Sequence, residues 1–320
     1  MQRRHLIALA ATALLSHAAA QAQADKTIRI LVGLPPGGSL DTVARLLAEN
    51  MRDDLKSNIV VESKLGAGGR VAADMLKSAA ADGTVLMVTP AVVPVLAPQV
   101  FGKLDYNPST DFAPVDHLAS FNFAFTVPAA LPVKTVAEFV AWVEANPDKA
   151  NFGSPAPGSP PHFFGEIISC ETQTNLVHVP YSAGAPLMNA PLGNEVSAGI
   201  DVVLEALENH RAGKVRIIAT SGDKRSSELP DAATFKEQGY PGIAASGWFA
   251  MHAPAKTPDA LPGASNRALN KALALPDVLE RLAKFGLAPG GGSAADPTRL
   301  EQASTARWAP VVKATEFRAE

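Results

Sequence analysis

The sequence predicts an α/β fold made of two lobes, each a mainly parallel sheet flanked by helices. The first observation is length, since 320 residues suggest two domains of about 150 residues each. The second is the alternation of strand-like and helix-like segments, which implies parallel sheets covered by helices. The third is that these segments fall into two groups, so we expect the chain to cross between lobes near Phe121–Phe125 and again near Tyr240–Trp248. Two such crossings form a hinge that suits closure on a ligand.

The first 24 residues are predicted to be a secretory signal peptide. Two arginines are followed by an apolar run from Leu6 to Leu15 and then by small residues, with cleavage expected near Ala22 or Ala24. The apolar run is shorter than the about 20 residues that a bilayer span needs. We therefore expect export to the periplasm, by a Sec or a twin-arginine route that the sequence leaves open.

Charge and cysteine content exclude several kinds of partner and site. The 28 basic and 31 acidic residues give a formal net charge of −3, and loss of the signal peptide removes two arginines and no acid, which leaves −5. An acidic chain is not expected to bind nucleic acid. The only cysteine, Cys170, lies far from the cleavage region, so we expect no lipid anchor, disulfide or multi-cysteine zinc site. We expect Cys170 to be buried or half-buried on a helix, and the mature protein to be a free monomer.

The first lobe is expected to comprise residues 25–123 together with residues 246–320. Its first helix is well marked, because apolar residues recur at helical spacing from Leu40 to Leu55 and Ser39 stands where an N-cap belongs. The expected elements are, in order, a strand at 27–34, a helix from 39, a strand at 58–62, a second helical stretch, a strand at 84–90 and, after the second crossing, a strand at 247–254 and helices from 258 to the end, which would pack back on this lobe.

Residues 124–245 are expected to form the second lobe, with a sheet of its own. It follows a proline-rich passage at 90–114 and ends in a loop-rich return from residue 225 to residue 247. The expected elements are strands at 123–127, 151–154, 176–180, 196–203 and 214–221, and helices at 136–144, at 160–170 and around 187.

The segment LPPGGSLDTVARLLAEN (34–50) contains a candidate anion site. A strand ends there, Gly37 and Gly38 allow a tight turn, and a helix starts at Ser39. Backbone N–H groups at a helix start lack partners and lie at the positive end of the helix dipole, which suits a carboxylate. Asp41, in the first turn, is expected to be a partner of the helix dipole or a cap.

A second loop of the same kind lies in FGSPAPGSPPHFFGE (152–166). The strand is expected to end at Gly153, Ser159 can cap the next helix, and Pro160 takes its first position. This is another helix N-terminus, now in the second lobe. If the two helix ends face each other across the hinge, they would hold one carboxylate from both sides or a ligand with two polar ends.

Enzyme chemistry is a weaker interpretation of the same residues. Ser154 or Ser159 with His162 could form a nucleophile and a base, but His162 lies in a helix start and no GxSxG elbow occurs in the chain. The motifs HExxH, GxxxxGK and GxGxxG are absent, GAGGRVAAD lacks the last glycine of the dinucleotide fingerprint, and His162 with Glu166 is expected to be a structural pair. We expect no metal, no cofactor and no catalysis; the alternatives are an exported serine/histidine hydrolase and an interaction module without a small ligand.

Six segments in order carry a resemblance to a known family. They are LPPGGSLDTVARLLAEN, VVESKLGAGG, FGSPAPGSPPHFFGE, LVHVPYSAGAP, KVRIIATSGDKRSSELPDAATFKEQGYPG and GWFAMHAP. Over nearly the whole mature chain the sequence resembles the Bug or TctC family of periplasmic solute receptors of tripartite tricarboxylate transporters. The resemblance implies a two-lobed periplasmic-binding-protein (Venus-flytrap, type II) fold that holds a carboxylate by backbone amides and ordered water rather than by an arginine. It also implies delivery to a permease with one large and one small integral membrane subunit.

The resemblance further implies which residues contact the ligand. They come from the first loop, the end of the third strand, the loop of the second lobe and a later strand end: Pro36, Gly37, Gly38, Ser39, Asp41; Thr89, Pro90, Ala91; Ser154, Ala156, Gly158, Ser159, His162; and Asp201. Asp201 is expected either to contact the distal end of the ligand or to cap its strand.

The chain departs from the family pattern in ways that bear on the pocket. Ser63 and Lys64 stand where the family usually has asparagine and arginine, and Pro155 removes a backbone donor next to the loop serine. The stretch PYSAGAPLMNAPLGNE departs from the usual spacing and so alters the expected shape of the distal pocket. Phe123 and Trp248 are expected either to stack on an aromatic ligand or to pack the hinge. The ligand stays open among mono-, di- and tricarboxylates, amino acids, aromatic acids and nicotinate-like rings.

Overall fold

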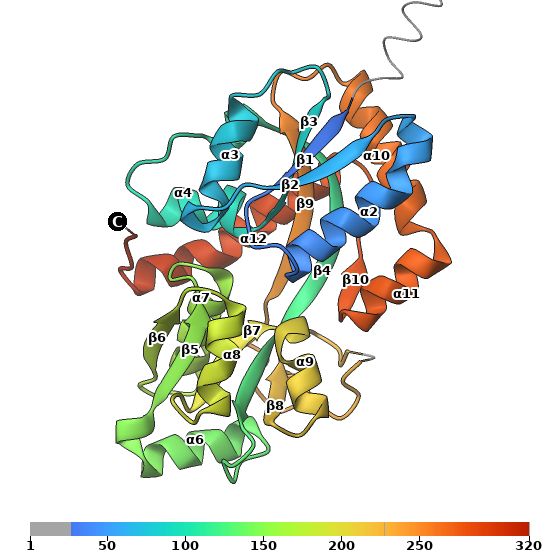
Figure 1. Ribbon diagram of the computed structural model, residues 1–320. Helices are drawn as coiled ribbons and strands as arrows, with labels where there is room; N and C mark the ends of the chain where they lie inside the picture. Colours follow the sequence, from blue (N-terminus) through green and yellow to red (C-terminus); the bar gives the residue numbers. More distant parts are fainter. Residues whose placement is uncertain (1–26, 227, 320) are drawn as a thin grey trace, which may run out of the picture.

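The computed structural model describes residues 27–226 and 228–319, which form an α/β structure in two halves joined by long strands (Figure 1). The two-lobed α/β architecture that the sequence predicts is confirmed. The predicted signal peptide lies outside the described residues. Within those residues, no helix is both long and apolar enough to cross a bilayer.

The first half holds a sheet with the strand order β2-β1-β3-β9-β4, and β10 pairs with the other edge of β4. Side chains of β1 alternate between two cores: Ile30 and Val32 face α2 and α10, whereas Leu31 packs with α3. The elements are β1 (Ile28–Val32), α2 (Ser39–Leu55), β2 (Ile59–Ser63), α3 (Arg70–Lys77), β3 (Val85–Pro90), β9 (Ser246–Pro254), α10 (Ala260–Leu273), α11 (Pro276–Lys284) and β10 (Leu287–Pro289).

The second half holds β5, β6 and β7, which pair in parallel, together with β8, which pairs with β4. Phe125 and Phe152 pack against α6 and α7 on one face, and Ala124 packs against α8 and α9 on the other. The elements are α6 (Val136–Ala145), β5 (Asn151–Pro155), α7 (Pro160–Glu171), β6 (Val177–Tyr181), α8 (Gly184–Leu192), β7 (Ala198–Val202), α9 (Val203–Arg211) and β8 (Val215–Thr220).

One long strand, β4 (Phe112–Pro128), belongs to both halves. It pairs with β9 as far as Asn122, and from Phe123 onward it pairs with β7 and β8. The strand begins 11 residues before the predicted start at Phe123 and reaches into the proline-rich passage. Pro114 is tolerated there because the ladder with β9 is irregular between Pro114 and Asp116. The change of partner falls at the predicted lobe boundary, although the lobe boundaries themselves stay a prediction.

The pairing differs in one respect from the mainly parallel sheets that the alternation predicts. Strands β1, β2 and β3 are parallel, and so are β5, β6 and β7, but β9 runs antiparallel to both β3 and β4, and β4 also runs antiparallel to β7, β8 and β10. The reason is the double crossing: β4 carries the chain out of the first half and β9 carries it back. Two neighbouring strands with these directions must be antiparallel.

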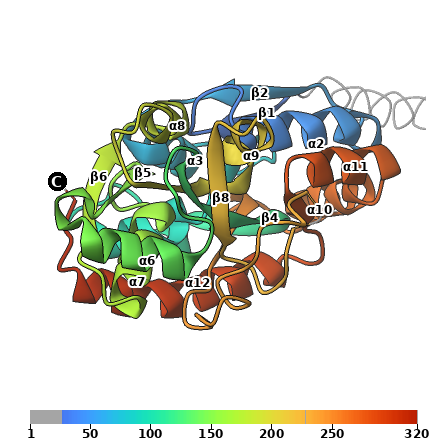
Figure 2. The same cartoon turned by 90° about the horizontal axis from the view of Figure 1, so that it is seen from below.

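The last helix, α12 (Ala295–Ala314), spans both halves instead of packing on the first alone. It contacts β4 and α4 (Ala97–Val100) of the first half and also α7 of the second. Beyond it, the Phe317 ring lies edge-on to His162 and Phe163 of α7. Figures 1 and 2 show α12 running beside α7 across the junction of the halves.

Several local expectations were wrong. Cys170 lies on α7 as predicted but is exposed, because the apolar face of that helix is formed by residues such as Phe164 and Ile168. Helix α9 and strand β10 were not predicted. The remaining short elements are turns of helix: η1 (Ala67–Gly69), η2 (Val92–Leu96), α5 (Pro108–Asp111) and η3 (Pro147–Lys149).

Candidate functional site

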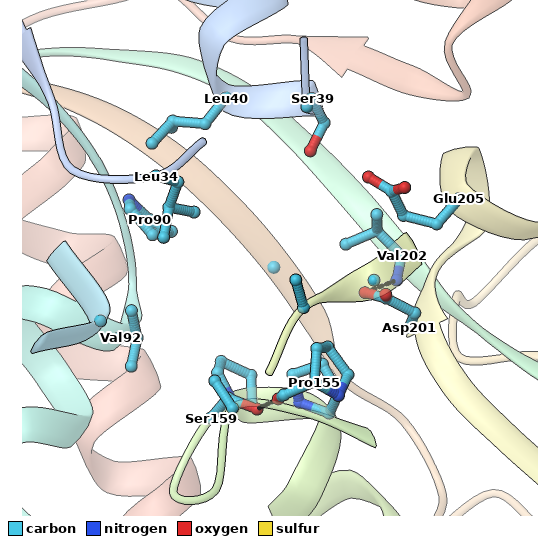
Figure 3. A pocket seen from close by; sticks show the side chains of 18 of the residues that line it. Leu34, Ser39, Leu40, Pro90, Val92, Pro155, Ser159, Asp201, Val202 and Glu205 are labelled. Carbon is cyan, nitrogen blue, oxygen red and sulfur yellow. Dashed lines mark hydrogen bonds between the residues drawn. The ribbon is translucent and has the colours of Figure 1, made fainter. Parts of the chain in front are cut away.

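A cavity of about 530 Å³ lies between the halves and is called here the cleft (Figure 3). It is lined by segments that follow the carboxyl ends of β1 and β3 in the first half and of β5, β6 and β7 in the second. In open α/β sheets, ligands bind in the crevice outside the carboxyl ends of the strands. The topology therefore brings five loops with exposed backbone to one place.

The N-terminus of α2 opens into the cleft with free hydrogen-bond donors. Gly38, and not Ser39 as predicted, is the N-cap, with φ −75° and ψ 172°, and no side chain caps the helix. Thr42 N–H donates to Gly38 O, but within the described residues nothing accepts from the N–H groups of Ser39, Leu40 and Asp41. Three adjacent donors at the positive end of a 17-residue helix make an anion site.

Asp41 does not line the cleft but stabilises the turn before α2 through hydrogen bonds. Its buried Oδ2 accepts from Gly37 N at 3.0 Å and from Arg45 Nε at 2.9 Å. Burial acts to raise the pKa of Asp41, but the hydrogen bonds from Arg45 and Gly37 outweigh it and hold the pKa below its usual value. The ionised carboxylate keeps Gly37 in its turn at φ +83°, a conformation that favours glycine.

The second loop reaches the cleft but cannot donate to an anion, contrary to expectation. Residues 155, 157, 160 and 161 are prolines without an N–H. The other three amides are occupied, because Ala156 N donates to Tyr181 O, Gly158 N to His162 Nδ1, and Ser159 N to Ala156 O. Ser159 is the N-cap as predicted, but its hydroxyl donates to Pro155 O at 2.6 Å. This loop therefore forms a firm wall of proline rings and carbonyl groups.

The donors of the second half come instead from α8, which sequence analysis did not single out as a site. Its first residues, Gly184 and Ala185, line the cleft, and within the described chain no group accepts from their N–H groups. The order strand, glycine, helix start was present in HVPYSAGAP. It is the same pattern that pointed to the first loop.

Of the fourteen residues predicted to contact a ligand, ten line the cleft and four do not. Those that line it are Pro36, Gly37, Gly38, Ser39, Pro90, Ala91, Ala156, Gly158, Ser159 and Asp201. Besides Asp41, the other three are Thr89, Ser154 and His162, which lie buried behind the lining residues. For all fourteen residues, contact with a ligand stays a prediction.

The serine and histidine residues do not assemble a hydrolase site. The hydroxyl of Ser154 is fully buried and hydrogen-bonded to His178 Nε2 at 2.8 Å, not to His162. His162 accepts a backbone N–H through Nδ1, and its ring stacks on His178 with centroids 3.9 Å apart. Burial, and then His162, lower the pKa of His178 to about 4. Among the described residues, no group of three His, Cys, Asp or Glu side chains is arranged to hold a metal ion.

Aromatic side chains and one arginine complete the cleft. Phe121 and Phe249 pack with ring centroids 4.6 Å apart, whereas Trp248 is 1% exposed and donates through Nε1 to Ser304 Oγ. Trp248 therefore mainly packs the crossing strand. Arg70, the first residue of α3, also lines the cleft and places its guanidinium 3.6 Å above the Phe101 ring. The position of Arg70 directly after GAGG, at a helix start, was the signal that could have identified it.

Two carboxyl groups, Asp201 and Glu205, lie at the second-half end of the cleft and are called here the acid pair (Figure 3). Asp201 Oδ1 accepts from Val202 N at 2.8 Å, while the buried Oδ2 has no partner in the described chain. Burial, and then the neighbouring Glu205, raise the pKa of Asp201 to about 8, and burial also raises the pKa of Glu205. Glu205, at the third position of the unpredicted α9, was missed for that reason.

Comparison with protein families gives one match over most of the chain. A family model described as "Tripartite tricarboxylate transporter family receptor" matches residues 43–317. Among curated sequences, the chain is 37% identical over 299 residues to the "UPF0065 protein in gbd 5'region" of Cupriavidus necator, with 90% of each chain covered.

Solved structures agree with this match. MatC from Rhodopseudomonas palustris with bound malate is 30% identical, with a TM-score of 0.81 over 89% of this chain and 98% of MatC. A second R. palustris protein, solved with adipate, is 28% identical, with a TM-score of 0.84 over 90% of this chain and 96% of the other.

Proposed function

This chain belongs to the tripartite tricarboxylate transporter family of receptors, which are binding proteins and not enzymes, and from that premise we propose that it captures a small organic carboxylate in the cleft. The observation that carries the proposal is the N-terminus of α2. Three adjacent N–H groups, of Ser39, Leu40 and Asp41, have no acceptor in the described chain and lie at the positive end of the helix, whose first two residues line the cleft. Similar proteins solved with malate and with adipate support a carboxylate as the ligand.

The proposal includes closure of the two halves on the ligand. The crossing strands meet where Ser221 ties them together: its Oγ accepts from Phe123 N at 2.8 Å and donates to Ala245 O at 2.5 Å. Motion about this point would bring the N-terminus of α8 toward the N-terminus of α2 and enclose the ligand between the two halves. Only a ligand that binds the closed form better can drive that motion.

The proposal also includes the place and the partners of the protein. A receptor of this family would act in the periplasm, after removal of the predicted signal peptide near Ala22 or Ala24. It would hand its ligand to a permease with one large and one small integral membrane subunit, acting as a monomer.

The test is a thermal-shift screen of the purified protein against monocarboxylates, dicarboxylates, tricarboxylates and aromatic acids. A ligand at about 100 times its Kd stabilises the fold by about 2.7 kcal/mol, which raises Tm by several degrees. If no acid in the panel raises Tm, the proposed function is wrong.

A matched pair of variants tests the role of the α2 donors. Ser39→Pro removes one N–H, and proline is accepted at the first helical position because Gly38 already has an extended conformation. Loss of a hydrogen bond to a charged group costs about 1.5–3 kcal/mol, so Kd should rise tenfold or more. Ser39→Ala keeps the N–H and should leave Kd within a few-fold of wild type. Equal Kd values for the two variants would contradict anchoring by this amide.

A further inference from the structure

The acid pair lies in the cleft without a cation to balance it. Asp201 is 8% exposed, and its Oδ2 is both buried and unpartnered in the described chain. Glu205 is half-buried and has no hydrogen bond or ion pair within the described residues. Its side chain points into the same cavity (Figure 3). A buried carboxyl oxygen without a partner is costly, so a ligand group that donates a hydrogen bond to it would be stabilised at this end of the cleft.

The two carboxyl groups lie close enough for one ligand group to reach both. A Cβ built on Gly184 would stand 2.7 Å from Asp201 Oδ2 and 3.3 Å from Glu205 Oε2, so these two oxygen atoms are no more than about 6 Å apart. Gly184 itself occupies that point, so a donor would reach the two oxygen atoms from the open side of the cleft. One ammonium nitrogen makes hydrogen bonds of about 2.8 Å to each of two such oxygen atoms.

We propose that the ligand carries a protonated nitrogen as well as its carboxylate, with the carboxylate on the N-terminus of α2 and the nitrogen between Asp201 and Glu205. This inference rests on the proposed function and names its substrate class, an amino-carboxylate. An ammonium group supplies up to three N–H donors and a positive charge, which stabilise the ionised form of both acids.

A second carboxylate on the ligand would fit this end less well. It would stand beside Glu205 and would oppose ionisation of Asp201, because like charges at close range in a poorly solvated site repel. The free N–H groups of Gly184 and Ala185 also lie here, and the positive end of α8 offsets part of the negative charge of the pair. A ligand carboxylate would compete with Asp201 and Glu205 for that same compensation.

The proposal predicts how binding depends on pH. The groups that face Asp201 are Glu205 on α9, the N-terminus of α8 and apolar Ala124 on β4, and Arg70 lies elsewhere along the cleft. Burial and Glu205 raise the pKa of Asp201 to about 8 in the free protein, so Asp201 is mostly protonated at pH 7. A cation favours the ionised form. Binding should therefore release a proton, and affinity should rise as the pH increases from 6 to 8.

The experiment is calorimetric titration of the full chain with matched ligand series. Each carbon number from three to six is represented by a monocarboxylate, a dicarboxylate and an ω-amino acid, and α-amino acids form a fourth series. At pH 7.5, at least one amino-carboxylate should bind ten or more times as tightly as the monocarboxylate and the dicarboxylate of equal length. Titration in two buffers with different ionisation enthalpies should show proton release.

Three variants make the result specific. Glu205→Gln and Asp201→Asn are nearly isosteric and should remove the preference for the amine while leaving monocarboxylate binding. Glu195→Gln makes the same charge change at an exposed position outside the cleft lining and should behave as wild type. If the melting curve shows that one acid-pair variant does not fold, the proposal is tested by the other variant and by the number of protons released when the wild-type protein binds.

The outcomes separate this inference from the proposed function. Tighter binding of dicarboxylates, proton uptake on binding, or an unchanged amine preference in the folded acid-pair variants would overturn the amino-carboxylate assignment and leave a carboxylate receptor. Absence of binding by every acid in all four series would overturn both.

Discussion

At the scale of single residues, Gly184 lies directly against the acid pair. An added Cβ would approach Asp201 Oδ2 to 2.7 Å, closer than carbon and oxygen atoms normally come. Gly184→Ala should push the Asp201 carboxyl group into the cleft and lower ligand affinity tenfold or more in a calorimetric titration. Folding stability should change by less than about 1 kcal/mol, because alanine is favoured over glycine in a helix.

The control for this prediction is Gly102→Ala. An added Cβ at Gly102 meets nothing within 4 Å, and Gly102 is outside the cleft lining. Wild-type affinity in Gly184→Ala would show that the space beside the acid pair is not part of the binding site.

The sequence correctly predicted the donor loop before α2 but wrongly predicted a second donor loop before α7. The turn before α2 follows from Gly37 and Gly38, since a strand, two glycines and an amphipathic helix define it locally. The second loop looked equivalent, but its amides are occupied by Tyr181 O, which the fold brings to Ala156, and by the local acceptors His162 Nδ1 and Ala156 O. The contact with Tyr181 joins residues distant in sequence, and the local contacts depend on side-chain and loop conformations that the residue pattern does not specify.

At the scale of elements, an ion pair across two parallel strands gives a prediction about pH. Arg29 on β1 donates to Glu62 on β2 at 2.6 Å and 2.8 Å, and Lys64 lies 2.9 Å from the same carboxylate. Hydrogen bonds from Arg29 and then Lys64 lower the pKa of Glu62 from 4.5 to about 2. The stabilisation is complete above the unfolded pKa and is lost as the pH falls from 4.5 toward 2.

Glu62→Gln should therefore be less stable than wild type at pH 7, by up to about 1 kcal/mol because both bases are partly solvated. The difference should shrink as the pH is lowered to 3, measured by urea denaturation. Glu144→Gln, at an exposed position of α6, removes the same charge and should not show this convergence. A difference between wild type and Glu62→Gln that grows at low pH would contradict the assignment.

The strands and helices themselves were largely predictable, apart from those that depend on tertiary pairing. Strand β1 and helix α2 follow from their hydrophobic periods. The first eleven residues of β4 were not predicted, because proline argues against a strand unless a partner accommodates it, as β9 does with an irregular ladder at Pro114. Strand β10 has three residues, and only pairing with β4 defines it.

At the scale of the whole molecule, closure is the property to measure. Small-angle scattering should show a lower radius of gyration with saturating ligand, because the halves would approach each other about the crossing strands β4 and β9. Ser39→Pro at the same ligand concentration should show a smaller change. If the ligand raises Tm as expected but leaves the radius of gyration unchanged, the protein binds its ligand without closing.

The long helix α12 limits the form that such a motion can take. It contacts β4 and α4 in the first half and α7 in the second, so the halves cannot separate freely on that side. We expect rotation that opens the cleft on the opposite side and keeps the contact of α12 with α7. This arrangement could not be predicted from sequence, which indicated only that the last helices return to the first lobe.

The four prolines of loop 155–161 have a consequence for the thermodynamics of capture. A loop of ordinary residues that becomes ordered around a ligand loses about 1–2 kcal/mol of backbone entropy per residue at the moment of binding. Proline rings restrict the backbone of four of these seven residues even in the unfolded chain, and hydrogen bonds occupy the remaining amides. One wall of the cleft is thus set before any ligand arrives, and the entropy lost on binding should come mainly from the ligand and from the motion of the two halves.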